Sequence, residues 1–316
     1  MNVKSIAMLI RRSYLIVISG TVLLLVACTG VRFGYNHADI FLVASLDEYV
    51  DLERAQEKLA KDRISALLAW HRSTQLHAYS ALLEEIRTKV KRPITLSEVT
   101  GLQQKLYDRL ETLGTRAAPE LAKLALTLGS GQITRVQHEL TNSNAKFRKK
   151  FGYIRTSMEN KLGARAKPFI KRAEFWLGKL TSEQRTLIWE AMARRDNGNY
   201  TWADEREARQ RDFLAVLSKI QERKPEEQLA TRWIRDYFAD LAYQTDPQRR
   251  AFVQALRQSN AELIAKVIAS ATPEQRETLD KKLQDYAADF AALAAEDRKF
   301  GHRPYSLRPN EKPNPT

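Results

Sequence analysis

The chain has 316 residues and carries 52 Lys and Arg against 38 Asp and Glu, a formal net charge of +14. Its 12 Gly, 10 Pro and single Cys exclude the collagen-like, low-complexity and disulfide-stapled classes of protein. The length suits one or two domains, since a domain usually has about 100–200 residues.

Residues 1–27 predict a secretory signal peptide. Three basic residues and no acid stand among the first 12, a largely apolar run covers residues 13–26, and the small Ala27 precedes Cys28. This order of features is typical of an export signal. The apolar run is too short for a membrane span, which needs about 20 residues.

The segment Leu25-Val26-Ala27-Cys28 resembles the bacterial lipobox. The resemblance implies that the thiol of Cys28 is acylated, that Cys28 becomes the mature N-terminus, and that the lipid bilayer is a partner. Because Thr29 follows instead of Asp, it also implies sorting to the outer membrane, with the protein facing the periplasm. Residues 28–37 then form a short lipidated tether. The alternative is an uncleaved signal anchor with a buried cysteine.

Residues 38–300 predict an all-α, multi-helix bundle of helical hairpins with roughly ten helices. Helix starts are marked by capping patterns at 95–98, 181–184 and 272–275 and by Asp246-Pro247. Turn residues predict helix breaks, one of which, at 129–131, could divide the body in two. The other predicted breaks are at 92–93, 118–119, 167–168, 197–199 and 224–225. Four prolines in residues 301–316 predict a disordered tail.

The clearest apolar stripe runs from Ile133 to Leu162, with apolar residues three or four positions apart. It predicts one helical face of about eight turns. Asn144 interrupts the stripe, and the preferred interpretation is a hydrogen-bonded core residue that fixes the helix register. The alternative is a polar switch or a ligand contact.

Eleven basic residues and only two acids lie between residues 146 and 179, which predicts a basic helical face that binds anions. The candidate residues are Lys146, Arg148, Lys149, Lys150, Arg155, Lys161, Arg165, Lys171 and Arg172. Because the signal peptide excludes nucleic acid as a partner, anionic lipid head groups, lipopolysaccharide phosphates and unfolded polypeptide remain. The alternative is a solvated face, or one paired with acids such as Glu84 and Glu85.

The chain contains no phosphate loop, serine elbow or zinc-helix motif. We therefore expect no enzyme activity, no cofactor and no metal site. His71 and His77 would lie on different faces of a helix. Two carboxylate pairs, Asp47 with Asp51 and Asp236 with Asp240, leave an envelope hydrolase as a remote alternative, with Asp47, Asp51 or His71 as its working groups.

Four stretches resemble a family of proteobacterial lipoproteins that is catalogued as a domain of unknown function. They are residues 35–39, residues 46–52, Trp70-His71-Arg72 with Leu76 and Tyr79, and residues 175–181 with Gln184. The resemblance implies no activity, cofactor or catalytic residue.

A second, weaker similarity is to the Spy/CpxP periplasmic chaperones. Leu-Thr-x-x-Gln turns carry it at residues 180–184 and, with Ala in the first position, at 271–275. It implies an ATP-independent chaperone. The expected function remains binding, in an envelope-maintenance role, through the basic face.

Overall fold

The computed structural model describes residues 30–153, 157–195 and 200–300. The predicted signal peptide, Cys28, Arg155 and the predicted tail lie outside them. The described residues form helices joined by turns, which confirms the all-α prediction of roughly ten helices. Residues 30–36 are helical, and eleven further helices follow within the described residues: α2 (Ala38–Val50), α3 (Arg54–Thr74), α4 (Leu76–Lys89), α5 (Leu96–Ala125), α6 (Ser130–Lys150), α7 (Met158–Leu177), α8 (Ser182–Arg194), α9 (Trp202–Arg223), α10 (Glu227–Tyr243), α11 (Pro247–Ala269) and α12 (Pro273–Phe300).

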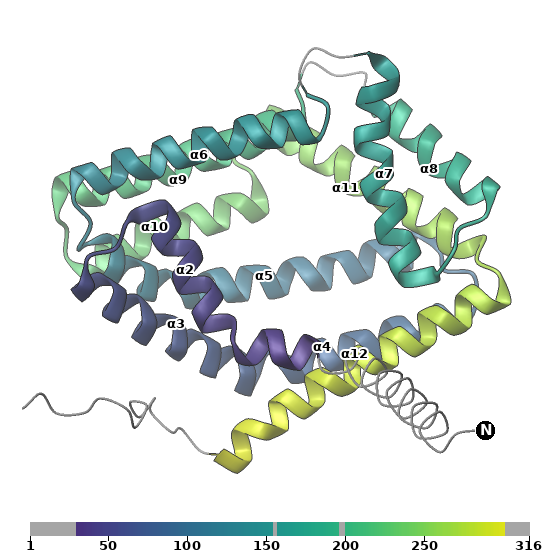
Figure 1. Ribbon diagram of the computed structural model, residues 1–316, viewed down its shortest axis with the longest axis horizontal. Helices are drawn as coiled ribbons and strands as arrows, with labels where there is room; N and C mark the ends of the chain where they lie inside the picture. The colour runs from purple at the N-terminus through teal and green to yellow at the C-terminus, as the bar shows by residue number, and fades with distance from the viewer. Residues whose placement is uncertain (1–29, 154–156, 196–199, 301–316) are drawn as a thin grey trace, which may run out of the picture.

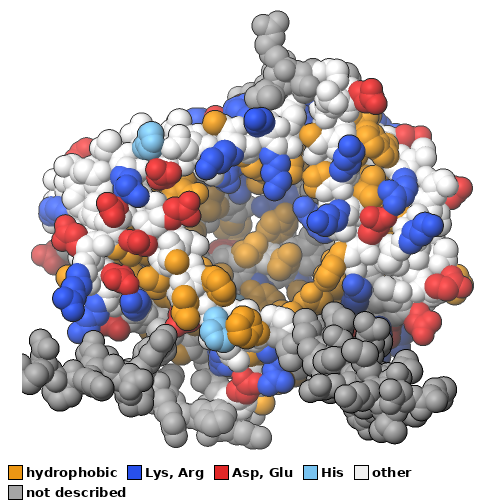
Figure 2. All heavy atoms as spheres, in the orientation of Figure 1, with side chains coloured by type: hydrophobic (Ala, Val, Ile, Leu, Met, Phe, Trp, Pro, Cys, Tyr) orange, Lys and Arg blue, Asp and Glu red, His pale blue; other side chains and the backbone are white. Residues whose placement is uncertain are grey.

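The helices follow one another around the periphery of the molecule, an arrangement that we call the ring (Figure 1). Along the upper side α6 packs on α9, along the lower side α4 packs on α12, and α5 crosses the molecule with α10 against it. One apolar cluster lies where α7, α8, α11 and α12 meet, around Ile188 and Leu263. A second, around Ile220 and Ile234, joins α5, α9 and α10. Because the core is divided between these clusters, the middle of the molecule stays hollow (Figure 2). None of the helices in the described ranges is long and apolar enough to cross a membrane.

Two buried glutamines tie the start of α8 to the start of α12. The amide of Gln184 donates to Gln275 Oε1 at 2.7 Å, and the amide of Gln275 donates back to Gln184 Oε1 at 2.9 Å. Each oxygen also accepts the backbone N–H of its own N-cap residue, Thr181 or Thr272. Each amide also donates to the backbone carbonyl two residues before the partner's N-cap. The capping boxes predicted at 181–184 and 272–275 are thus confirmed. Their glutamine side chains are hydrogen-bonded to each other and link the two helix starts.

The same unit recurs between the starts of α3 and α6. Gln56 and Gln132 exchange hydrogen bonds of 3.1 and 2.7 Å, and their oxygens accept the backbone N–H groups of Glu53 and Gly129. Their amides again donate to the carbonyls two residues before the partner's N-cap. In Figure 1, α3 and α6 begin at the left end of the molecule, whereas α8 and α12 begin at the right end. The two glutamine pairs therefore fix opposite ends of the ring.

The predicted single helix over the apolar stripe is wrong. The chain turns after α6, and Gly152 has φ +69°, a conformation that favours glycine. A Cβ at this position would lie 2.9 Å from Lys161 Cα, so glycine also allows the turn to approach α7 closely. The basic residues before and after position 152 consequently belong to two helices and do not form one continuous face.

Two predicted breaks are also wrong, because Pro119 lies inside α5 and Pro168 inside α7. A proline in a helix interior costs about 3 kcal/mol. In both cases buried residues surround the proline: Ala118 and Ala122 are fully buried, as is Ala166. The packing of these stretches outweighs the local cost. The breaks at 92–93, 129–131 and 224–225 are confirmed. The predicted break at 197–199 lies outside the described residues.

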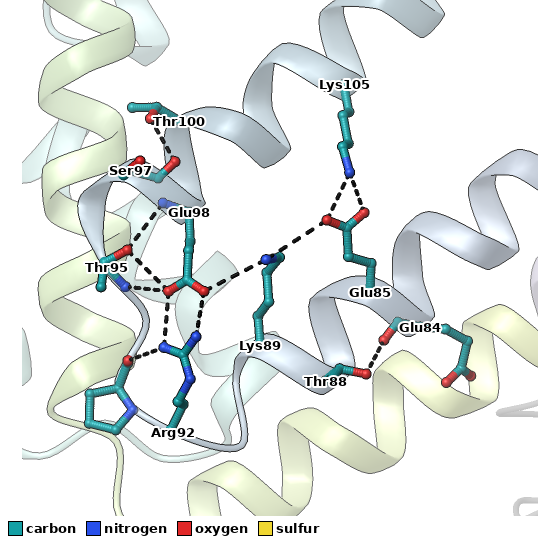
Figure 3. A network of polar contacts seen from close by, with 11 residues as sticks. Glu84, Glu85, Thr88, Lys89, Arg92, Thr95, Ser97, Glu98, Thr100 and Lys105 are labelled. Atoms are coloured by element: carbon teal, nitrogen blue, oxygen red, sulfur yellow. Dashed lines mark hydrogen bonds and ion pairs between the residues drawn. The ribbon is translucent and has the colours of Figure 1, made fainter.

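A polar network surrounds the turn between α4 and α5 (Figure 3). Thr95 and Glu98 form the predicted capping box, and Arg92 donates two hydrogen bonds to Glu98. The hydrogen bonds from Arg92 and Thr95 lower the pKa of Glu98 to about 2. Nearby, Glu85 accepts from Lys105 at 2.6 Å. Glu84 pairs with Arg87. In the described part of the chain, neither acid forms an ion pair with the basic segment 146–179, as one alternative had it.

Asn144 is hydrogen-bonded, as the sequence favoured, but it is half-buried and does not lie in the core. Its amide donates to Gln210 Oε1 at 2.6 Å, and its oxygen accepts from Arg206 Nε at 3.0 Å. These bonds fix the register between α6 and α9.

Glu205 joins α9 to α11 through a buried charge network. Its side chain has no exposed surface, and its oxygens accept from Arg209 Nε at 2.6 Å, Arg249 Nε at 3.0 Å and the Tyr200 hydroxyl at 3.0 Å. Burial favours the neutral acid, but the hydrogen bonds from Arg249, Arg209 and Tyr200 outweigh it and hold the pKa of Glu205 below its ordinary value. Burial and this carboxylate raise the pKa of Tyr200 to about 12.

We expect Gln184→Ala to lower the free energy of unfolding by about 1–3 kcal/mol, because it leaves the buried amide of Gln275 without its partner. Gln275→Ala should act similarly. The double variant should lose clearly less than the sum of the two single losses, since the second change removes a group already unpaired. Urea unfolding of the three variants measures this coupling, and strictly additive losses would contradict the reciprocal pairing.

Glu205→Gln should lower the free energy of unfolding by about 3 kcal/mol at pH 7, because it leaves guanidinium groups buried beside a neutral amide. A carboxylate with a lowered folded-state pKa stabilises the protein above its ordinary pKa of 4.5 and loses that effect as the pH falls through the folded-state value. The difference from the wild type should therefore shrink toward acid pH. Glu190→Gln, in an exposed pair with Arg194, is the control and should change little at either pH. A difference that does not vary with pH would contradict this account.

Candidate functional site

The centre of the ring holds a cavity of about 1540 Å³, which we call the hollow. It is open on the face seen in Figure 2, where orange apolar side chains cover its floor. Helices from both halves of the chain line it with aliphatic and aromatic residues. Among them are Leu67, Leu113, Phe169, Trp176, Phe238 and Ile264.

Helical spacing explains how single helices serve both the core and the hollow. On α5 the lining residues Leu110, Leu113, Ala117 and Leu121 recur at threes and fours and so face the same way. Leu110 remains 50% exposed although it faces the interior of the ring. Apolar surface left uncovered in a concave site marks a place where a ligand or partner binds.

Four arginines line the hollow from the end built by α7, α8 and α11: Arg165, Arg172, Arg195 and Arg257. Arg195 follows α8 directly, and its Nε donates to Ser259 Oγ on α11 at 2.9 Å. The guanidinium of Arg165 lies 4.8 Å from the centre of the Tyr153 ring. These contacts bring cationic groups from three helices toward one end of the cavity.

Arg195 and Arg257 stand out because, within the part of the chain that the structure describes, neither forms an ion pair with a carboxylate. Nη2 of Arg195 and Nε of Arg257 are buried and lack a hydrogen-bond partner. Burial also lowers the pKa of Arg195. Arg257 instead lies over the Tyr107 ring, with its Cζ 3.8 Å from the ring centre. Both arginines are half-buried. A buried guanidinium nitrogen without a partner is costly, and an anion placed beside it would reduce that cost.

Two other arginines that line the hollow form ion pairs with carboxylates of the protein. Arg63 pairs with Glu120, which also binds Arg116. Arg209 pairs with the buried Glu205. The charge available to a ligand is therefore concentrated at the α7–α8–α11 end.

The structure separates the predicted basic residues into groups with different surroundings. Arg148 is paired with Asp204 at 2.8 Å and with Glu207 at 2.6 Å, and the hydrogen bonds that it donates to these carboxylates raise its pKa. Its guanidinium is thus already occupied. Arg165 and Arg172 reach the hollow. The remaining described members lie outside its lining, on exposed or half-buried surface: Lys146, Lys149, Lys150, Lys161 and Lys171. Figure 2 shows blue side chains along the rim formed by α6 and α7.

The sequence prediction missed Arg195 and Arg257. Arg257 lies between Val253, Leu256 and Ile264, which share its face of α11, and a basic residue in an apolar register is a signal that could have identified it. Arg195 offered no such signal, because it lies at the end of a helix and its environment comes from α7 and α11.

Two of the carboxylates considered for a hydrolase accept hydrogen bonds from the backbone at helix ends, whereas Asp236 is exposed within α10. Asp47 accepts from the backbone N–H of Leu52 at 2.8 Å, and Asp240 accepts from that of Thr245 at 2.8 Å. Asp51 is 75% exposed on its side chain. His71 lines the hollow, and its Nδ1 forms a hydrogen bond of 2.9 Å with the Tyr35 hydroxyl. Burial lowers the pKa of His71. Among the described residues, no three His, Cys, Asp or Glu side chains lie together so that they could hold a metal ion.

Comparison with known proteins gives one family. A model of a family of unknown function (DUF6279) matches residues 48–237. This match confirms the expected resemblance to an uncharacterised family. No curated protein and no solved structure matches the chain.

We expect Arg195→Met to raise the free energy of unfolding by about 0.5–2 kcal/mol, because it removes a buried charge that has no acid partner. Arg148→Met is the matched control, and it should lower that free energy by about 1.5–3 kcal/mol, since it strips two carboxylates of their charged hydrogen-bond donor. Urea unfolding of the ligand-free protein measures both. A loss for Arg195→Met as large as that for Arg148→Met would show that Arg195 has a structural role only.

Proposed function

The chain belongs to the DUF6279 family, whose function is unknown, and on this premise we propose that it binds an amphiphile with an anionic head group in the hollow. The observation that carries the proposal is the pair of half-buried arginines, Arg195 and Arg257, which line an apolar cavity. Each has a buried guanidinium nitrogen without a hydrogen-bond partner, and neither forms an ion pair with a described carboxylate. The role is binding, not catalysis.

The chemistry of the hollow defines the class of ligand. Pockets for drug-sized molecules measure about 300–1000 Å³, and the hollow exceeds that range, so it suits one or more acyl chains. Guanidinium groups bind carboxylates and phosphates through paired hydrogen bonds. Fatty acids, phospholipids and lipopolysaccharide share this combination of acyl chain and anionic group.

The proposed location follows from the N-terminal sequence. Acylation of Cys28 would anchor the protein to the outer membrane, with its body in the periplasm and close to lipid. The exposed Lys146, Lys149 and Lys150 at the end of α6 would add attraction to anionic lipid surfaces, about 1 kcal/mol for each base near such a surface. Together these features support an envelope-maintenance role in which the protein holds or transfers lipid.

A second candidate is an ATP-independent chaperone of the Spy/CpxP type. The observation that favours it is the pairing of the two Thr-x-x-Gln turns through Gln184 and Gln275. In this case the hollow would receive apolar segments of an unfolded chain. Suppression of the aggregation of a reduced client by the segment Thr29–Thr316 would favour this candidate, and no effect at stoichiometric excess would exclude it.

The direct test of lipid binding compares a fluorescent fatty acid with its uncharged methyl ester on delipidated Thr29–Thr316. The wild type should bind the acid at least about tenfold more tightly than the ester, because charged hydrogen bonds contribute about 1.5–3 kcal/mol. Arg195→Met combined with Arg257→Met should abolish this preference and leave ester binding nearly unchanged.

A variant whose hollow is filled by a larger side chain provides a second test of lipid binding. Ala173→Trp places a large side chain in the lining and should weaken acid and ester alike. Lys149→Met, outside the lining, is the control and should retain the preference for the acid. Equal affinity of the wild type for acid and ester, or unchanged binding in the filled variant, would overturn the proposal.

A further inference from the structure

The start of the described chain exposes an apolar strip that no other element covers within the described residues. Phe33, Ile40 and Phe41 are 61%, 52% and 59% exposed, and we call them the N-terminal patch. Backbone hydrogen bonds from His37 N to Phe33 O and from Phe41 N to His37 O carry the helical course through the turn at His37. Residues 33, 37, 40 and 41 consequently lie on one face. The His37 ring stacks near Phe33, with 4.2 Å between the ring centres.

The patch is not the side of α2 that packs on the body. Val43 and Val50 are buried, and Val50 packs with Leu128 and Val136. Helix α2 is therefore apolar on two sides, one inside the protein and one in water. A soluble helix normally carries polar residues on its outer face, so the outer apolar face indicates a surface that something apolar covers.

Charge and position indicate what covers it. Between residues 30 and 46, Asp39 is the single acid, and the one base, Arg32, is bonded to Glu296. The patch begins five residues after Cys28, the position that the sequence predicts to be acylated, and five residues span at most about 17 Å. An acyl chain at Cys28 would hold Phe33, and with it the whole face, at the membrane surface.

We propose that the N-terminal patch inserts into the interfacial region of a lipid bilayer and seats the body on the membrane. The occupant is the bilayer itself: aromatic and branched aliphatic side chains on one helical face are the groups that interfacial helices bury. The proposal draws on the acylation of Cys28 put forward under the proposed function, but the patch acts through its own apolar surface.

Insertion of the N-terminal patch into the bilayer would also place the hollow close to lipid. Tyr35, Leu42 and Leu46 belong to the same stretch of chain as the patch and line the hollow. The segment in contact with the bilayer thus also borders the cavity, so an amphiphile could pass between them along apolar surface.

The experiment uses Thr29–Thr316, which contains every described residue and cannot be acylated at position 28. Its partition onto neutral phosphatidylcholine vesicles is measured by co-sedimentation at low and high salt. We expect Ile40→Ser combined with Phe41→Ser to weaken partition at least about tenfold, with little dependence on salt, because apolar burial and not charge is lost. Leu106→Ser combined with Leu229→Ser removes exposed apolar side chains of α5 and α10 and should leave partition unchanged.

Several outcomes would overturn the proposal. Equal partition of the patch variant and the wild type would do so, as would an equal loss in the Leu106/Leu229 control. Self-association of the wild type that the patch variant abolishes, without any effect on vesicles, would assign the patch to a second copy of the chain. Fatty-acid binding measured without vesicles is independent of these results: the patch variant should retain it, which also shows that the variant is folded. Loss of fatty-acid binding with intact vesicle partition would overturn only the proposed function.

Discussion

The shape of this protein depends on two glutamine pairs that hold helix starts together at opposite ends of a ring. In each pair, each side-chain oxygen accepts two hydrogen bonds and each amide donates two. One bond of each kind joins the two glutamines; the second bond to each oxygen caps that glutamine's own helix, and the second bond from each amide holds the turn before the partner's helix. Buried amides with all partners satisfied define one geometry and tolerate little displacement. The helices therefore diverge from fixed points and enclose a space, whereas a chain without such ties could collapse its apolar faces onto one another.

The enclosed space has a free-energy cost that the rest of the protein offsets. Apolar side chains such as Leu110 face the cavity uncovered, and Arg195 and Arg257 lie at one end of it without an ion pair to any described carboxylate. The buried carboxylate of Glu205, by contrast, accepts hydrogen bonds from three donors. Because Arg63 and Arg209 pair with carboxylates whereas Arg195 and Arg257 pair with none in the described residues, we interpret the end of the hollow at Arg195 and Arg257 as a site for an anion that comes from outside. This is the usual relation between local instability and function at binding sites.

The helices and their caps could be predicted from the sequence because they follow local rules. Thr95, Thr181 and Thr272 each cap a helix, as their spacing from Glu or Gln predicted. The break at Gly152 and the continuity through Pro119 and Pro168 could not, since tertiary packing decides them. For the site, the sequence located Arg165 and Arg172, which reach the hollow, but grouped them with Arg148, whose charge Asp204 and Glu207 neutralise. Whether a cation such as Arg148 is paired depends on acids that lie about 60 residues away in the chain. Composition alone does not predict such a pairing.

The most direct test of this account is a crystal structure of Thr29–Thr316 purified from its native envelope without delipidation. The account predicts continuous electron density of one or more acyl chains along the apolar wall of the hollow, with the anionic head group within hydrogen-bond distance of Arg195 and Arg257. A hollow filled only by water, or closed by inward movement of the helices with both guanidinium groups turned to solvent, would contradict it.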